Sequence, residues 1–161
     1  MDFGGNNLGM PIARRPWFQA KSITSQSVTT STYTKVLFQT VDGDTGLFDL
    51  SLNRFVCPNE GWWIFYAWLE MPGGGGTPQM TMAILPNSFT NSSNQYSTST
   101  WNFSGNASIW CQPAQAGDGY MQLTLPMMCK RGDYVEVAGY NQNSTPTFAA
   151  GAVFRGVFLG P

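Results

Sequence analysis

Residues 62–71, WWIFYAWLEM, constrain the fold more than any other part of this chain. Aromatic and β-branched residues favour β-strands, and turn-forming residues at 58–61 and 72–76 bound the run. The two faces of such a strand would carry, respectively, Trp63, Phe65, Ala67, Leu69 and Met71, and Trp62, Ile64, Tyr66 and Trp68. A strand with one solvated face alternates apolar and polar residues, whereas both faces here are apolar. The sequence therefore predicts a core on one face and a second buried surface on the other, supplied by a neighbouring copy of the chain.

The rest of the chain has the pattern of an all-β protein. Short runs of apolar, aromatic and β-branched residues alternate with turns rich in Gly, Pro, Asn and Asp, and no segment longer than a turn has a helical pattern. We expect strands at residues 17–21, 33–40, 45–51, 54–56, 62–71, 79–85, 97–103, 107–111, 119–125, 134–140 and 153–159. Such closely spaced short strands are typical of a sandwich or a barrel.

One domain is expected, with a short arm before it. The 161 residues are enough to bury a single hydrophobic core. Residues 1–16 are rich in Gly and Asn, have no alternating pattern, and end in Arg14, Arg15 and Pro16. They are therefore predicted to form an N-terminal arm outside a domain that spans residues 17–161.

The charge composition argues against nucleic acid and membranes as partners. Eight Lys and Arg residues stand against nine Asp and Glu residues, and charged residues make up only 11% of the chain. Such a chain has no basic field to attract phosphates. No apolar run approaches the roughly 20 residues of a transmembrane helix, and the first residues lack the basic start and apolar centre of a signal peptide.

Catalysis and cofactor binding are not expected. The chain has no histidine, so nucleophiles activated by histidine are excluded, and neither Glu60 nor Glu70 has a second acid placed for glycoside chemistry. Asp42, Asp44 and Asp49 could supply oxygen ligands to Ca²⁺, but acids in such sequences are ordinary turn formers. We therefore expect no enzyme activity, no cofactor and no metal.

Three cysteines, Cys57, Cys111 and Cys129, cannot all pair within one chain. They lack the spacing of a zinc site. They are interpreted as buried, reduced thiols that act as small apolar side chains. This interpretation favours assembly in a reducing compartment over secretion.

Two short motifs could have a functional role, but each also has a simpler explanation. Arg131, Gly132 and Asp133 spell an integrin-binding tripeptide, but Gly-Asp is also a common turn, which is the preferred interpretation. Glycosylation sequons begin at Asn91, Asn102, Asn106 and Asn143. In a chain rich in Asn, Ser and Thr such sequons arise by chance, and without a signal peptide they would stay unmodified.

Residues 33–67 carry an aromatic residue, then a Phe, then a stretch that follows the pattern Gly-x-Tyr-x-Phe at fixed spacing, with Trp63 where Tyr is usual. Its positions here are Phe48, Phe55, Gly61, Trp63 and Phe65, with Phe-x-Cys-Pro at 55–58. The closing segments RGDYVEV and FRGVFLGP complete the pattern, and Leu37, Gly43 and Ala67 depart from it. The chain thereby resembles the complement component 1q and tumour necrosis factor superfamily over roughly residues 17–161.

The resemblance implies a ten-stranded antiparallel jelly roll that forms tight homotrimers. It places Phe48, Phe55, Trp63 and Phe65 in the core. It implies trimer contacts through Ile64, Tyr66, Trp68, Tyr120, Phe154 and Phe158, with Gly156 allowing a close backbone approach.

The fold does not fix the function, because the same trimeric head serves several purposes. A head without a signal peptide, a stalk or catalytic groups is expected to be a virion protein, namely a phage-type cement or decoration protein on the outer capsid surface. Arg14, Arg15 and Trp17 would then bind the major capsid protein, although the arm could equally be a leader without function. The alternative is a receptor-binding or adhesive head, either a fibre tip or a secreted ligand-like module.

Overall fold

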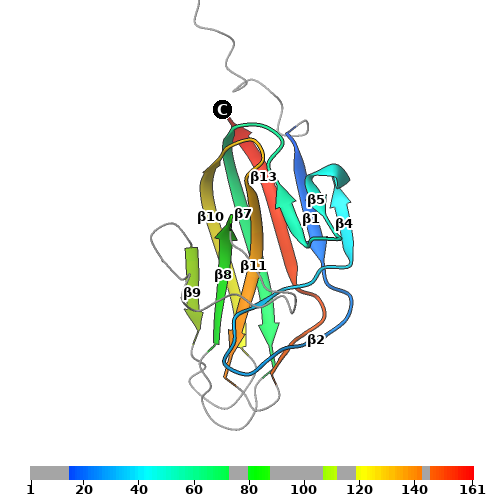
Figure 1. Ribbon diagram of the computed structural model, residues 1–161, viewed down its shortest axis with the longest axis vertical. Helices are drawn as coiled ribbons and strands as arrows, with labels where there is room; N and C mark the ends of the chain where they lie inside the picture. Colours follow the sequence, from blue (N-terminus) through cyan, green and yellow to red (C-terminus); the bar gives the residue numbers. More distant parts are fainter. Residues whose placement is uncertain (1–14, 73–79, 88–106, 112–118, 143–145) are drawn as a thin grey trace, which may run out of the picture.

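A computed structural model of the chain shows two β-sheets packed face to face (Figure 1). The structure describes residues 15–72, 80–87, 119–142 and 146–161, and the backbone of 107–111. The arm up to Arg14, the strand expected at 97–103 and all four sequons lie outside these residues. Within the described part, the only helix is one short 3-10 turn, η3 (Thr45–Leu47), so the all-β prediction is confirmed. None of these residues forms a helix that is long and apolar enough to span a membrane.

The first sheet has five antiparallel strands in the order β10-β7-β13-β1-β4. Their bounds are Gly119–Cys129, Gly61–Met71, Val153–Gly160, Trp17–Lys21 and Thr40–Gly43, respectively. The interior strand β7 pairs with β10 over its whole length and with β13 on its other side. The long apolar segment recognised in the sequence is therefore an interior strand of this sheet.

The second sheet follows the order β5-β6-β11-β8-β9, and β3 pairs with β11 beside β6. The bounds are Phe48–Asp49, Arg54–Val56, Tyr134–Asn141, Met80–Pro86 and Ala107–Cys111, with Thr34–Lys35 for β3. A separate ribbon joins β2 (Gln26–Ser27) to β12 (Thr147–Phe148). The strand segments of the described part are thus more numerous than the ten expected, and several of them have only two residues.

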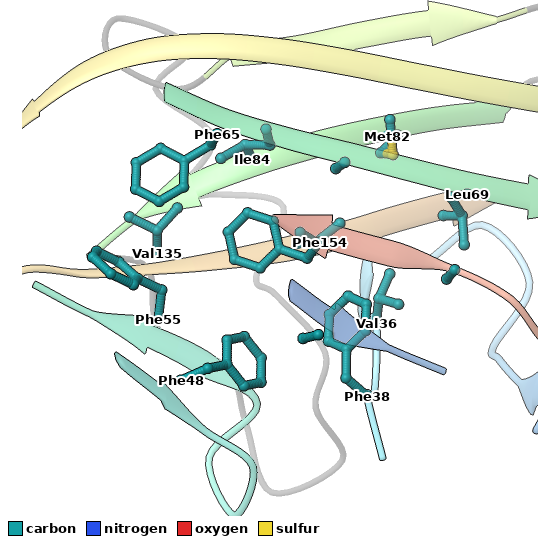
Figure 2. Packing of buried hydrophobic residues seen from close by; sticks show 14 of the residues in the cluster. Val36, Phe38, Phe48, Phe55, Phe65, Leu69, Met82, Ile84, Val135 and Phe154 are labelled. Carbon is teal, nitrogen blue, oxygen red and sulfur yellow. The ribbon is translucent and has the colours of Figure 1, made fainter. Parts of the chain in front are cut away.

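The core between the sheets is dominated by phenylalanine. The rings of Phe18 and Phe55 stack with centroids 5.2 Å apart, and the ring of Phe154 meets Phe18 edge-on at 5.2 Å. Figure 2 shows part of this core, in which Phe48, Phe55, Phe65 and Phe154 lie among Val36, Leu69, Ile84 and Val135. Each buried Phe contributes roughly 1.5–3 kcal/mol relative to an exposed one, so these contacts are a main source of stability.

The segment expected as one strand at residues 33–40 is interrupted. Only β3 and the start of β4 form ladders there, while Val36 and Phe38 between them are buried in the core. Two backbone N–H groups are satisfied by side chains instead. The N–H of Leu37 donates to Gln26 Oε1 at 2.9 Å, and the N–H of Phe38 donates to Asn53 Oδ1 at 2.6 Å.

Candidate assembly face

The outer face of the first sheet has an unusual chemistry for a surface open to water. On β7, Trp63, Phe65, Ala67, Leu69 and Met71 are buried, and the other parity points away from the core. Trp62 is 47% exposed, and Ile64, Tyr66 and Trp68 are partly exposed. The row of large apolar side chains expected from the sequence therefore lies on the outside of this chain.

The neighbouring strands extend this row into a broad surface. The β7–β13 register sets Trp68 opposite Val153, Tyr66 opposite Arg155, and Ile64 opposite Val157. On the other side of β7, β10 presents outward-facing residues that are exposed: Tyr120, Gln122, Thr124, Pro126 and Met128. We call the outward-facing side chains of β10, β7 and β13 the assembly face.

Two shallow hollows mark this face. One of about 230 Å³ is lined by Trp68, Tyr120, Met121 and Gln122, and the rings of Trp68 and Tyr120 lie 6.5 Å apart. The other, of about 220 Å³, lies between Trp62 and the C-terminal residues 159–161. Tyr120 is 60% exposed.

The expected contribution of Phe154 and Phe158 to this face needs correction. Phe154 is fully buried and packs against Phe18 and Phe65 in the core. Phe158 lies on the same parity and packs on Trp63, with ring centroids 5.3 Å apart. Gly156 between them makes room for the Phe18 ring, because a Cβ on Gly156 would lie 2.3 Å from Phe18 Cε1. The side of β13 that carries Phe154 and Phe158 therefore faces the core.

Val153, Arg155 and Val157 occupy the outer positions instead, and the sequence analysis missed them. A signal was present in the alternation, because Arg155 lies on the parity opposite to Phe154 and a charged side chain avoids an apolar core. The Arg155 guanidinium donates to Gln19 Oε1 on the neighbouring strand β1.

The start of the domain is held at two points. The Trp17 N–H donates to Asp44 Oδ2 at 3.0 Å, and the Asp44 N–H donates to the Trp17 carbonyl at 2.8 Å. The Phe158 N–H donates to the Pro16 carbonyl at 2.9 Å. Trp17 remains 41% exposed and Arg15 is partly exposed. The chain therefore enters the jelly roll at a fixed place, beside the end of β13.

The acids considered as calcium ligands each have another partner. Asp42 pairs with Lys21 Nζ at 2.6 Å, and Asp44 accepts from Trp17. Asp49 accepts from the Ser51 hydroxyl at 2.6 Å, and this hydrogen bond lowers its pKa. Across the described ranges, no group of three or more metal-ligating side chains comes together.

The Arg-Gly-Asp segment is a turn whose acid is engaged. The Asp133 carboxylate accepts from the Lys130 N–H at 2.8 Å and from Asn87 Nδ2 at 3.0 Å. Gly132 has φ +89°, a conformation that favours glycine. This geometry uses the aspartate to close the turn rather than to present it to a partner.

Comparison with solved structures shows the fold. The chain superposes on the globular domain of zebrafish complement 1qA with a TM-score of 0.62 and 12% identity, covering 89% of this chain and 97% of that one. It superposes on murine APRIL with a TM-score of 0.61 and 10% identity, covering 91% of this chain and all of that one. The protein thus has a jelly-roll sandwich of the complement 1q and tumour necrosis factor type.

Sequence comparisons add no closer relationship. No protein-family model matches the chain, and no curated protein matches it by sequence. The likeness that the sequence motifs indicated is therefore one of fold.

Proposed function

We propose that this protein is a structural protein that assembles as a homotrimer and decorates the outer surface of a viral capsid. The observation that carries the proposal is the assembly face. Its large side chains, Trp62, Ile64, Tyr66 and Trp68, form a continuous row on β7, with Tyr120 and Met128 exposed beside them. Contiguous apolar surface of this kind marks interaction sites, and aromatic residues are enriched in interface cores.

A partner that is a second copy of the chain suits the composition of this face. Apart from Arg155 and Glu70, its residues on β7 and β13 are uncharged, so self-association would bring few like charges together. Obligate interfaces between copies typically bury upwards of about 2,000 Å² and resemble a divided core. The trimeric arrangement that the sequence resemblance implies would cover the face by packing three copies about one axis.

Attachment to a capsid shell would use the N-terminal arm. Pro16 and Trp17 are held by β13 and Asp44, so three arms of one trimer would leave from equivalent, fixed places. Arg14 and Arg15 would pair with acidic groups of the major capsid protein, with Trp17 as an apolar anchor. Several modest contacts made by one rigid trimer add up to firm binding.

Deletion of residues 2–15 tests the capsid role. The shortened chain should still form trimers by light scattering but should no longer bind emptied particles in a sedimentation assay. The matched control replaces Lys130 and Arg131, an exposed basic pair in the β10–β11 turn, by alanine and should bind normally.

Unchanged binding by the shortened trimer would contradict the arm as the docking element. The docking surface would then lie on the jelly roll, and a receptor-binding or adhesive head, on a fibre or secreted, would be the better explanation. Copy number separates the two further, since a decoration protein occurs in hundreds of copies per particle and a fibre tip in a few dozen at most.

A further inference from the structure

Two cysteines from different sheets meet in the interior at one end of the sandwich. Cys57 follows β6 of the second sheet, and Cys129 is the last residue of β10 in the first sheet. Both side chains are buried in the main core cluster, both are free, and the two thiols interact with each other. The two cysteine side chains therefore lie between the two sheets.

The backbone fixes this meeting independently of the thiols. The Cys57 N–H donates to the Asp133 carbonyl at 2.8 Å, and the Cys57 carbonyl accepts from the Gly132 N–H at 2.9 Å. Asp133 also closes the β-turn that begins right after Cys129, because its N–H donates to the Lys130 carbonyl at 3.0 Å. Cys129 itself is held opposite Gly61 in the β7–β10 ladder. Hydrogen bonds on both sides therefore keep Cys57 close to Cys129.

The surroundings keep both thiols protonated while the structure is closed. Burial raises the pKa of Cys57, and burial together with the neighbouring Cys57 raises the pKa of Cys129 to about 12. The Cys57 Sγ–H donates to the Asn59 carbonyl at 2.9 Å. Because the thiolate is the reactive form, exchange must begin with a local opening that breaks the hydrogen bond to the Asn59 carbonyl and admits solvent to Cys57.

We infer that Cys57 and Cys129 are a modification site, a dithiol that oxidises to a disulfide joining the two sheets. The oxidant is a low-molecular-weight disulfide. The Cys57 thiolate attacks one sulfur of that disulfide, forming a mixed disulfide and releasing the first small thiol after it takes up a proton. The Cys129 thiolate then attacks the Cys57 sulfur and expels the second small thiol. One small disulfide is reduced to two thiols, and the protein dithiol loses two electrons and two protons.

The cross-link would stabilise the fold in proportion to the chain it encloses. A disulfide between positions this far apart in sequence removes much conformational freedom from the unfolded chain. It would also tie the sheets together at the end where β13 finishes and the C-terminus lies (Figure 1). The oxidised protein should therefore melt roughly 5–15 °C higher than the reduced protein.

The test incubates the full-length protein with excess oxidised glutathione in a low concentration of urea, which allows local opening. Intact-mass analysis should show the loss of two hydrogen atoms per chain, and non-reducing peptide mapping should join the peptides that contain Cys57 and Cys129. The melting temperature should rise and should return to its starting value after reduction.

Single variants separate this pair from general oxidation. Cys57→Ser and Cys129→Ser should each lose the cross-link and the rise in melting temperature, whereas Cys111→Ser should keep both. Three free thiols after prolonged incubation of the wild-type protein would overturn the inference. So would glutathione attached to Cys57 without transfer to Cys129, or a cross-link that involves Cys111.

Discussion

The ammonium nitrogen of Lys35 lies 2.7 Å from a carboxylate oxygen of Glu136, and both side chains are buried. The same oxygen lies 3.0 Å from Arg54 Nη2, and Lys35 also donates to the Leu52 carbonyl at 3.0 Å. This cluster fastens β3 and β6 to β11 on the outer side of the second sheet. A buried charge is tolerated only when it is paired, so the three side chains depend on one another.

Glu136→Gln should lower the free energy of unfolding by about 3–5 kcal/mol, because it leaves the buried Lys35 ammonium without its counter-charge. Urea unfolding monitored by fluorescence measures the change. Lys21→Met is the control, since it removes a solvent-exposed ion pair with Asp42 and should change the free energy of unfolding far less. If both variants lost a similar amount of unfolding free energy, the buried cluster would contribute no more to stability than an exposed ion pair does.

Tyr66→Asp should convert the proposed trimer to monomers or to insoluble protein. The substitution places a charge in the middle of the assembly face, and threefold packing would bring three such charges together. Light scattering distinguishes a mass of 17.7 kDa from three times that value, about 53 kDa. Val56→Asp alters an exposed apolar strand residue of the other sheet and should leave the mass unchanged. If the Tyr66→Asp variant still formed trimers, the interface between copies would have to lie on another surface.

Gly156→Ala should destabilise the protein by about 1–3 kcal/mol, the usual cost of overpacking a core. The new Cβ would lie 2.3 Å from Phe18 Cε1, so β1 and β13 would have to shift. Gly46→Ala has no atom within 4 Å of the added Cβ and is the matched control. Thermal unfolding of the two variants compares them directly, and equal melting temperatures would contradict the tight Phe18 contact.

The stabilising effect of the Asp49 charge should disappear in acid. The Ser51 hydroxyl and the Ser51 and Leu52 N–H groups bond its carboxylate and hold its pKa below the ordinary value of 3.8. Because the folded-state pKa is the lower one, the contribution is complete above that ordinary value and is lost as the pH falls through the folded pKa.

The measurement for Asp49 compares the wild-type protein with Asp49→Asn in urea at several pH values. Asparagine can still accept from the same N–H groups, so the difference isolates the charge. The difference in unfolding free energy should be constant near about pH 6 and should shrink below about pH 3.8. A difference that does not change down to acid pH would show that the charge contributes nothing.

Prediction from the sequence was most accurate where side chains alternate between the two faces of a single strand. In β7, period-2 spacing separated the face with Trp63 and Phe65 from the face with Ile64 and Tyr66, because successive side chains of a strand cannot share a face. The family resemblance then indicated which of these two apolar faces is buried. Prediction was less accurate at residues 33–40, where side-chain oxygens of Gln26 and Asn53, rather than a neighbouring strand, accept hydrogen bonds from the backbone. Hydrogen bonds from side chains distant in the sequence leave no local pattern.

Composition, alternation and short motifs are local properties, and they were enough to predict the all-β class, the jelly-roll likeness and the doubly apolar strand at residues 62–71. Packing of the sheets settled which face of β13 is buried, although the charge of Arg155 already favoured burial of the opposite face, which carries Phe154. Phe154 and Val157 are both apolar, and the choice between their parities depends on Phe18, which fills the space above Gly156. The meeting of Cys57 and Cys129 likewise required two sheets to pack, because nothing near either residue specifies a partner so far along the chain.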